Sequence, residues 1–232
     1  MEPRFVGRIG LADVVTIANA AVGFLATVAA IVDITLAVRL ILLAAIADAL
    51  DGVIARHRGG TTVGEYLDSL ADVASFGVAP ASVVAVVILD VWHQSNWWGL
   101  ALGGTALFVA AAVTRLGLYT AYDSASNETE GVQTTLAATI LAASVLAGFT
   151  NPAILSALVV ILTVLMLAPI TYPDLHAQDA IVMGSVQTAA IGLTGSFGHH
   201  IAGTLGEGFA FGLLFLSLAY LVFGPQFYWR RE

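Results

Sequence analysis

Four aspartates within 25 residues are the part of this sequence best suited to chemistry. Asp48 and Asp51 are three residues apart, and Asp68 and Asp72 are four apart. Residues at these spacings share one face of an α-helix. The connection between the two pairs, roughly residues 56–63, is short. We therefore expect two antiparallel neighbouring helices whose four carboxylates converge.

Convergent carboxylates predict a cation site. Like charges in one pocket cannot all stay ionised unless a cation neutralises them. Ligation by oxygen alone favours Mg²⁺, Mn²⁺ or Ca²⁺ over zinc or copper. Proteins usually hold Mg²⁺ with a few carboxylates together with a substrate phosphate. We therefore expect Mg²⁺ or Mn²⁺, with two ions clamping a phosphoryl group, and Arg56 as a positive partner for phosphate oxygens.

The helices that must position these acids lie in a strongly apolar chain. Hydrophobic residues make up 59% and charged residues 10% of 232 residues, and the mean hydropathy is +0.91, whereas soluble proteins are about 25% charged. Eight apolar segments are predicted, near residues 12–32, 36–56, 67–89, 97–121, 131–149, 151–171, 179–195 and 203–223. The fold class expected is an all-α polytopic membrane protein with about eight transmembrane helices, forming one catalytic domain over residues 1–232. Carboxylates at membrane depth are costly and usually functional.

Arginines predict the orientation in the membrane. Eight spans would place three groups on one side: Arg4 with Arg8, Arg56 with Arg58, and Arg230 with Arg231. The positive-inside rule makes that side cytoplasmic. We therefore expect a multi-pass protein of the cell membrane, surrounded by membrane lipid, with its acidic site at the cytoplasmic face.

The acids belong to a longer pattern. It reads Asp48-x-x-Asp51-Gly52-x-x-Ala55-Arg56, then seven residues, then Gly64-x-x-x-Asp68-x-x-x-Asp72. This pattern resembles the complete signature of the CDP-alcohol phosphotransferases. The resemblance implies membrane enzymes, usually homodimeric, that use divalent metal to transfer a phosphatidyl-type group from a CDP-linked lipid to an alcohol. CMP is the other product, and no nucleic-acid partner is expected.

The same resemblance implies roles for individual residues. The metal ligands would be the four aspartates, Asp48, Asp51, Asp68 and Asp72, with Asp72 also the general base. The nucleotide and its diphosphate would lie against Asp48, Gly52, Ala55, Arg56, Gly64 and Asn19.

Three further blocks are similar to the bacterial and archaeal phosphatidylserine synthase branch of that family. They are Leu67-Asp68-Ser69-Leu70-Ala71-Asp72 continuing through Ala81, Thr16-x-x-Asn19-x-x-x-Gly23-Phe24, and Thr114-Arg115-Leu116. The branch implies L-serine as acceptor and CDP-archaeol or CDP-diacylglycerol as donor. Leu118 and Thr120 depart from the branch pattern, and residues 131–138 lack its prolines. These departures concern contacts to the acceptor more than the chemistry.

Composition and one isolated charge refine this expectation. The chain has no lysine and a net charge of −8, which favours adaptation to high salt. Together with a resemblance to haloarchaeal sequences, this points to a halophilic archaeon and to archaetidylserine as product. Arg115 lies inside an apolar segment, and we expect it to bind the acceptor carboxylate or a lipid phosphate.

Other readings stay open. Within the family, the acceptor could be inositol phosphate or glycerol phosphate. Those acceptors carry a phosphate, and only Arg56, Arg58 and Arg115 are placed to bind one. Outside the family, the aspartates could serve a cation transporter, or the chain could be a noncatalytic membrane scaffold.

Overall fold

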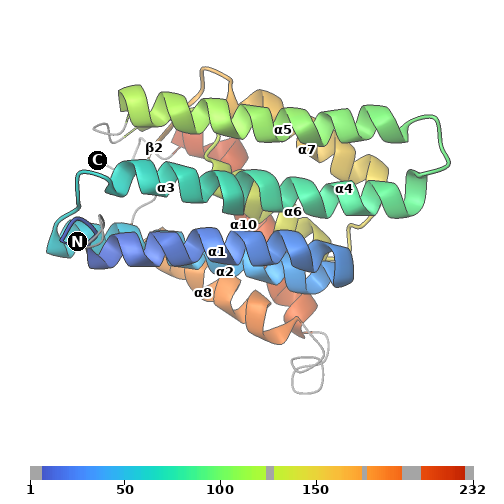
Figure 1. The fold of residues 1–232 in the computed structure, drawn as a ribbon. Coiled ribbons are helices and arrows are strands. Elements are labelled where there is room, and N and C mark those ends of the chain that lie inside the picture. Colours follow the sequence, from blue (N-terminus) through green and yellow to red (C-terminus); the bar gives the residue numbers. More distant parts are fainter. Residues whose placement is uncertain (1–6, 124–127, 174–176, 195–204, 228–232) are drawn as a thin grey trace.

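A computed structural model describes residues 7–123, 128–173, 177–194 and 205–227. Figure 1 shows a bundle of long helices, most of them roughly along one axis. The helices are α1 (Leu11–Val32), α2 (Ile34–Arg58), α3 (Gly64–Asp72), α4 (Ala79–Trp92), α5 (Trp98–Leu118), α6 (Thr134–Leu146), α7 (Pro152–Met166), α8 (Ala177–Leu193) and α10 (Leu205–Phe227). Two π-helical turns, η1 (Val73–Val78) and η2 (Tyr119–Asp123), and two strands, β1 (Glu128–Glu130) and β2 (Thr171–Pro173), complete the described residues.

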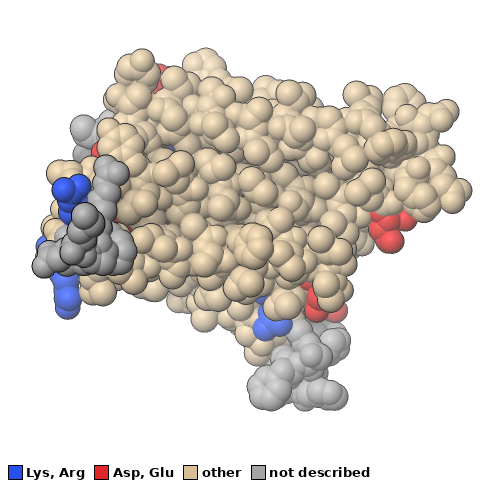
Figure 2. Space-filling model, in the orientation of Figure 1, with Lys and Arg blue, Asp and Glu red and all other residues tan. Residues whose placement is uncertain are grey.

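Some of the helices have the length and composition of membrane spans. Among the described residues, four helical segments are long and apolar enough to cross a bilayer: Leu11–Val32, Gly64–Trp92, Trp98–Tyr122 and Leu205–Gln226. On the face shown in Figure 2, the coloured charged side chains lie toward the ends of the bundle and the middle is uncharged. The predicted all-α, multi-pass membrane fold is confirmed. The count of eight spans stays a prediction, because α6 and α7 have only 13 and 15 residues, against roughly 20 for a full crossing.

The helix boundaries follow from local chemistry. Asp33 alone separates α1 from α2, with an extended backbone (φ −151°, ψ 101°) and a side chain that accepts the Leu36 N–H at 3.0 Å. Gly59 ends α2 at φ +86°, a left-handed conformation that costs glycine little. Asn151 caps α7 by accepting the Ala153 N–H at 2.9 Å. The predicted breaks after residues 32, 56 and 149 therefore correspond to real helix ends.

A widened helical turn follows the last motif aspartate. Residues Gly64–Trp92 form one continuous span, but η1 interrupts its α-helical hydrogen bonding directly after Asp72, and the Ala79 N–H bonds to the carbonyl of Ala74. Pro80, in the first turn of α4, has no N–H to give to the preceding turn. Such π-turns occur often at functional sites.

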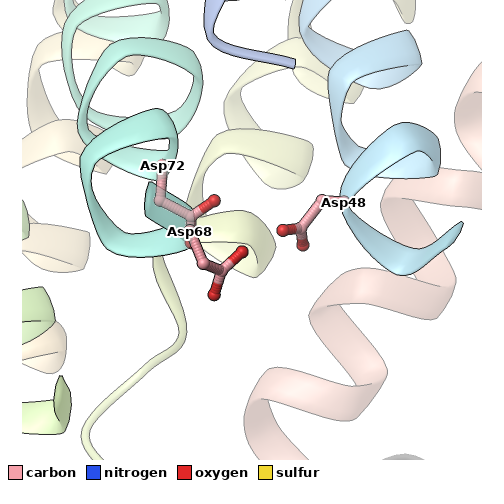
Figure 3. Close-up of side chains that lie close together, drawn as sticks. All are labelled: Asp48, Asp68 and Asp72. Atoms are coloured by element: carbon pink, nitrogen blue, oxygen red, sulfur yellow. The ribbon is translucent and has the colours of Figure 1, made fainter. Parts of the chain in front are cut away.

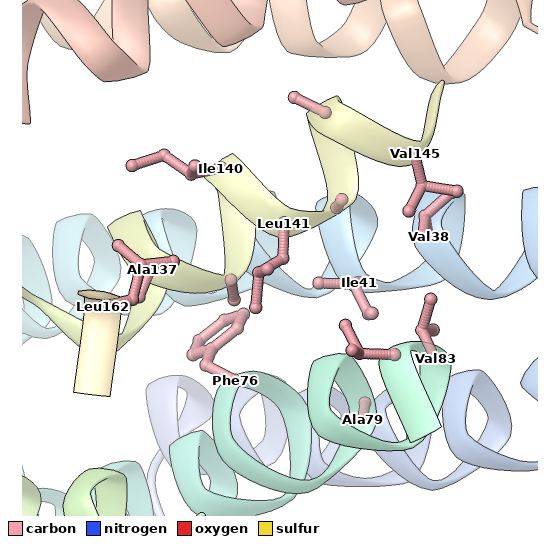
Figure 4. Packing of buried hydrophobic residues seen from close by; sticks show 14 of the residues in the cluster. Val38, Ile41, Phe76, Ala79, Val83, Ala137, Ile140, Leu141, Val145 and Leu162 are labelled. Atoms are coloured by element: carbon pink, nitrogen blue, oxygen red, sulfur yellow. The ribbon is translucent and has the colours of Figure 1, made fainter. Parts of the chain in front are cut away.

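The apolar core surrounds α6. Every residue of α6 from Leu136 to Leu146 is buried. Figure 4 shows Leu141 of α6 pointing toward Ile41 of α2 and Phe76 of η1, and Val145 beside Val38 of α2. Neighbouring helices therefore cover this stretch of α6 on all sides.

A small two-stranded sheet joins two distant connections. β1 pairs antiparallel with β2, with Thr129 opposite Tyr172, at the end of the bundle where both chain termini lie (Figure 1). The Tyr172 hydroxyl donates to the Leu221 carbonyl at 3.0 Å, which fixes the sheet to α10. Residues 128–130 lie in the connection between η2 and α6. The sequence pattern did not predict a strand there. Of the predicted cytoplasmic arginines, Arg4, Arg230 and Arg231 lie outside the described residues.

Candidate active site

Three of the four motif aspartates come together between α2 and α3. Asp48, Asp68 and Asp72 each present a carboxylate oxygen within 4.8 Å of the other two. Figure 3 shows Asp48 extending from α2 toward Asp68 and Asp72 on α3. Asp72 is buried, and the other two are half-buried. The convergence that helical spacing predicted is therefore present for these three residues.

The connection between α2 and α3 sets their antiparallel arrangement. After Gly59 reverses the chain, the Gly64 N–H bonds to the Thr61 carbonyl at 3.2 Å and the Leu67 N–H to the Val63 carbonyl at 3.0 Å. These two bonds start α3 immediately after the turn. The short connection keeps Asp48 and Asp68, which lie on different helices, close together.

The fourth motif aspartate faces a different helix. Asp51 is buried, and its Oδ2 atom accepts a hydrogen bond of 2.6 Å from the Thr16 hydroxyl of α1. It is not one of the three residues whose oxygens cluster. A metal-ligand role for Asp51 therefore stays a prediction, and the interaction visible in the structure is with α1.

Asp72 has the least satisfied carboxylate of the cluster. Its Oδ1 atom is buried and has no hydrogen-bond partner among the described residues. Arg115 of α5 lies near enough for its charge to interact with that of Asp72, and its guanidinium carbon is 5.6 Å from the centroid of the Tyr119 ring. Leaving a buried acceptor unpaired costs roughly 1–3 kcal/mol. This cost indicates a site that a ligand completes.

The donor set fits a hard divalent cation. The cluster consists of carboxylates alone, and oxygen ligands of this kind suit Mg²⁺ or Mn²⁺. A bound cation would also offset the repulsion among three neighbouring acids and give the Oδ1 atom of Asp72 a partner. The residues present therefore fit the divalent metal that the sequence predicts.

The residues predicted to contact nucleotide are spread over three helices. On α2, the exposed Arg56 lies over Gly52, where an added Cβ would be 3.5 Å from Nη1 of Arg56. Ala55 is half-buried on the same helix. At the start of α3, Gly64 faces Asp13 of α1, whose Oδ1 would lie 3.0 Å from a Cβ at this position. The absence of a side chain at Gly64 thus leaves room for the Asp13 carboxylate. The nucleotide contact predicted for Gly64 is a separate role.

Asn19, the remaining predicted nucleotide contact, is a buried residue of α1. It is 1% exposed, and neither polar atom of its side chain has a hydrogen-bond partner among the described residues. Its backbone carbonyl accepts a bond of 3.0 Å from the hydroxyl of Ser75, which is three residues beyond Asp72 on η1. Like Asp72, Asn19 is therefore a buried residue with side-chain polar atoms that have no hydrogen-bond partner among the described residues.

Fold and site together define a class of protein. A multi-pass helical membrane protein carries an all-carboxylate cluster near one end of its helices, beside an arginine. This combination suits a membrane enzyme that handles a phosphate-containing lipid substrate.

Comparison with known proteins makes the class specific. The family model for CDP-alcohol phosphatidyltransferase matches residues 9–193. The chain belongs to this family and is a transferase enzyme, as its signature predicted.

The relatives include an archaetidylserine synthase and serine phosphatidyltransferases. The chain is 30% identical over 183 residues to the archaetidylserine synthase of Methanothermobacter thermautotrophicus, covering 77% of this chain and 76% of that protein. It is 52% identical over 55 residues to the CDP-diacylglycerol–serine O-phosphatidyltransferase of Mycobacterium leprae, covering 23% of this chain and 18% of that protein. The enzyme of the same name from Mycobacterium bovis is 41% identical over 86 residues, covering 37% and 28%.

The sequence pattern did not single out Asp13, and it did not predict the contacts that Thr16, Ser69 and Thr120 make. Asp13 and Thr16 bind groups on the α2–α3 unit, and Ser69 hydrogen-bonds to Thr120 across α3 and η2. A signal for Asp13 was present: it is an acid at the start of an apolar segment, three residues before Thr16 on the same helical face. No comparable signal marked the bond between Ser69 and Thr120, since it joins two distant segments.

Proposed function

We propose that this enzyme is a metal-dependent CDP-lipid:L-serine phosphatidyltransferase. The observation that carries the proposal is the convergence of Asp48, Asp68 and Asp72, which are signature positions of the family, in a chain related over most of its length to an archaetidylserine synthase. The products would be a serine phospholipid and CMP. With CDP-archaeol as donor, the phospholipid is archaetidylserine.

The proposed reaction replaces the phosphoanhydride bond of the CDP-linked lipid with a phosphodiester bond to serine. The serine hydroxyl oxygen forms a bond to the lipid-linked phosphorus, and the bond from that phosphorus to the oxygen bridging to CMP breaks. Asp72 accepts the hydroxyl proton as this attack proceeds, which is general-base catalysis. CMP leaves with the bridging oxygen, so atoms and charge balance.

Each acid has a proposed place in this reaction. Divalent ions held by Asp48, Asp68 and Asp72, with Asp51 as a proposed further ligand, would supply positive charge to the diphosphate. Because a carboxylate is a weak base toward an alcohol, much of the rate must come from holding the serine hydroxyl in line with the phosphorus. The rigid α2–α3 pair is suited to this positioning.

We propose that the two substrates bind against different helices. The cytidine diphosphate would lie along α2, against Gly52 and Ala55, with Arg56 near its phosphates. The acceptor would lie beside α5, where Arg115 binds the serine carboxylate or a lipid phosphate, and Asn19 of α1 would offer its amide to the nucleotide or its diphosphate. We place this site at the cytoplasmic face and expect the enzyme to act as a homodimer in the membrane.

An acceptor panel tests the proposal. Purified protein in detergent or liposomes is given CDP-archaeol, Mg²⁺ or Mn²⁺ and one alcohol at a time, and CMP release is measured. We expect release with L-serine and little with inositol phosphate or glycerol phosphate. Release that depends on another alcohol would reject the serine assignment and keep the transferase.

The same preparation separates the proposal from its rivals of other classes. A cation transporter would carry divalent ions across liposome membranes and release no CMP. A noncatalytic scaffold would show neither activity, and its behaviour would not depend on the aspartates.

A further inference from the structure

A further acid, buried and outside the cluster, contacts the connection between α2 and α3. Asp13, in the first turn of α1, is 2% exposed. Its Oδ2 atom accepts two hydrogen bonds of 2.8 Å, one from the Gly10 N–H and one from the Thr61 hydroxyl. Burying a carboxylate is expensive unless its hydrogen bonds are made. The hydrogen bonds from Gly10 and Thr61 therefore offset the cost of burying the Asp13 carboxylate.

One of the two bonds caps the start of α1, and the other joins α1 to the connection between α2 and α3. Gly10 precedes α1, and Thr61 lies in the connection between α2 and α3. An added Cβ at Gly64 would lie 3.0 Å from Oδ1 of Asp13 and 3.5 Å from the Thr61 hydroxyl oxygen. The first spacing is tight and the second is an ordinary contact, so the missing side chain of Gly64 lets the start of α3 approach the Asp13 carboxylate.

A second contact on the same face of α1 reaches α2. Thr16, three residues after Asp13 and also buried, donates its hydroxyl to Oδ2 of Asp51 at 2.6 Å. The first two turns of α1 thus bind α2 at Asp51 and α3 at its first residues. These are the two helices that carry the opposed acids of the cluster, Asp48 three residues before Asp51 and Asp68 four residues after Gly64.

We propose that Asp13, assisted by Thr16, is a positioning residue for the transferase site. It fixes the α2–α3 connection against α1 and thereby sets the spacing between Asp48 and Asp68. Gly64 serves this contact by leaving room for the Asp13 carboxylate, a task distinct from the nucleotide contact that the family signature implies. This inference deepens the proposed function and rests on it for the chemistry that the spacing supports.

Hydrogen exchange tests the anchoring directly. We expect amides of residues 59–68 to exchange at least ten-fold faster in Asp13→Ala than in the unmodified protein, because the connection loses its bond to α1. Thr61→Ala should show a smaller increase, and Thr61→Ser, which keeps the hydroxyl, should exchange like the unmodified protein. Asp90→Ala, an exposed acid at the end of α4, is the matched control and should leave this segment unchanged.

Each exchange result decides the question. Unchanged exchange over residues 59–68 in Asp13→Ala would overturn the proposal. If Asp13→Ala does not fold, Thr61→Ala and Asp13→Asn still decide, because the first removes the hydroxyl donor and the second removes the charge of the acceptor at unchanged size. Exchange equal to that of the unmodified protein in both would then overturn it.

Coupling between positions 13 and 64 tests the link to the cluster. Mn²⁺ binding, followed by the loss of the free-ion electron paramagnetic resonance signal, is compared in Gly64→Ala, Asp13→Ala and the double variant. We expect each single change to weaken Mn²⁺ binding about five-fold or more, and Gly64→Ala to add little once Asp13 is absent. Equal losses from Gly64→Ala in both backgrounds would overturn the role given to Gly64.

These readouts distinguish failure of the inference from failure of the proposed function. If the unmodified protein releases no CMP with serine, the proposed function fails, while the exchange and Mn²⁺ comparisons still decide whether Asp13 positions the acids. If serine-dependent CMP release is seen but Asp13→Ala changes neither exchange nor Mn²⁺ binding, the positioning role fails alone.

Discussion

The acidic cluster and the core around α6 are two buried regions of the same bundle, built on opposite rules. Around α6, small and branched side chains such as Leu141 and Val145 fill the space against α2, η1 and α4. In the cluster, three acids face one another and the Oδ1 atom of Asp72 has no partner among the described residues. The apolar side chains of the core pack against one another, whereas the acids of the cluster repel one another unless a cation offsets their charge.

The comparison predicts opposite effects of mutation on stability and on activity. A change in the core should cost stability and leave the chemistry of each folded molecule intact. A change in the cluster should abolish the chemistry and, in the absence of divalent cation, cost little stability or even increase it, because it removes repulsion between like charges.

The largest effect on activity is expected at Asp72. Asp72→Asn removes the proposed base and a proposed metal ligand with almost no change in size, so turnover should fall by roughly 10²- to 10⁴-fold. Thermal unfolding without divalent cation should occur at the same temperature or higher. Glu65→Gln, at an exposed acid one turn before Asp68, is the control. Near-normal turnover in Asp72→Asn would contradict the base assignment.

The largest effect on stability is expected in the core. Leu141→Ala removes a buried side chain of α6 and should destabilise the protein by about 2–5 kcal/mol. The activity remaining per folded molecule should be unchanged, as measured by CMP release normalised to the folded fraction. A selective loss of turnover with unchanged stability would show that the two regions are not separable in this way.

An intermediate effect is expected at Arg115. It is buried on α5 and its charge interacts with that of Asp72. Arg115→Gln should raise the KM for serine roughly ten-fold or more, since hydrogen bonds to charged groups contribute about 1.5–3 kcal/mol. Arg115→Lys should recover part of this. A change in kcat with an unchanged KM for serine would instead place Arg115 with the phosphate.

The smallest effect is expected at Asp33, away from both regions. Asp33→Ala removes the side-chain cap of α2 and should cost about 1 kcal/mol of stability without changing turnover. Thermal unfolding and CMP release measured on the same sample check both parts. An effect on turnover here would show that the acidic cluster responds to the opposite end of α2.

Helical spacing and apolar segments were sufficient to predict much of this molecule. They placed the break at Asp33, the antiparallel pair of helices and the meeting of Asp48 with Asp68 and Asp72. These features depend on local periodicity, which a single sequence displays. The class of cation, inferred from the ligand type alone, stays a prediction.

Other features depend on contacts between distant segments and could not be read from spacing. The side-chain direction of Asp51 is set by the Thr16 hydroxyl of another helix. The β1–β2 pairing joins residues about 40 positions apart. The burial of α6 comes from the helices around it, and its composition of small residues does not reveal that. The π-turn after Asp72 had a sequence signal in Pro80, but its exact place depends on packing.

The central claim is that the carboxylate cluster is the catalytic centre of a serine phosphatidyltransferase. The most direct test is incorporation of labelled L-serine into chloroform-soluble lipid by purified protein with CDP-archaeol, with divalent cation first removed by chelation and then restored. We expect one CMP released for each serine incorporated, no product after chelation, recovery with Mn²⁺ or Mg²⁺, and no recovery in Asp68→Asn. Serine incorporation that persists after chelation, or that is undiminished in Asp68→Asn, would contradict the account.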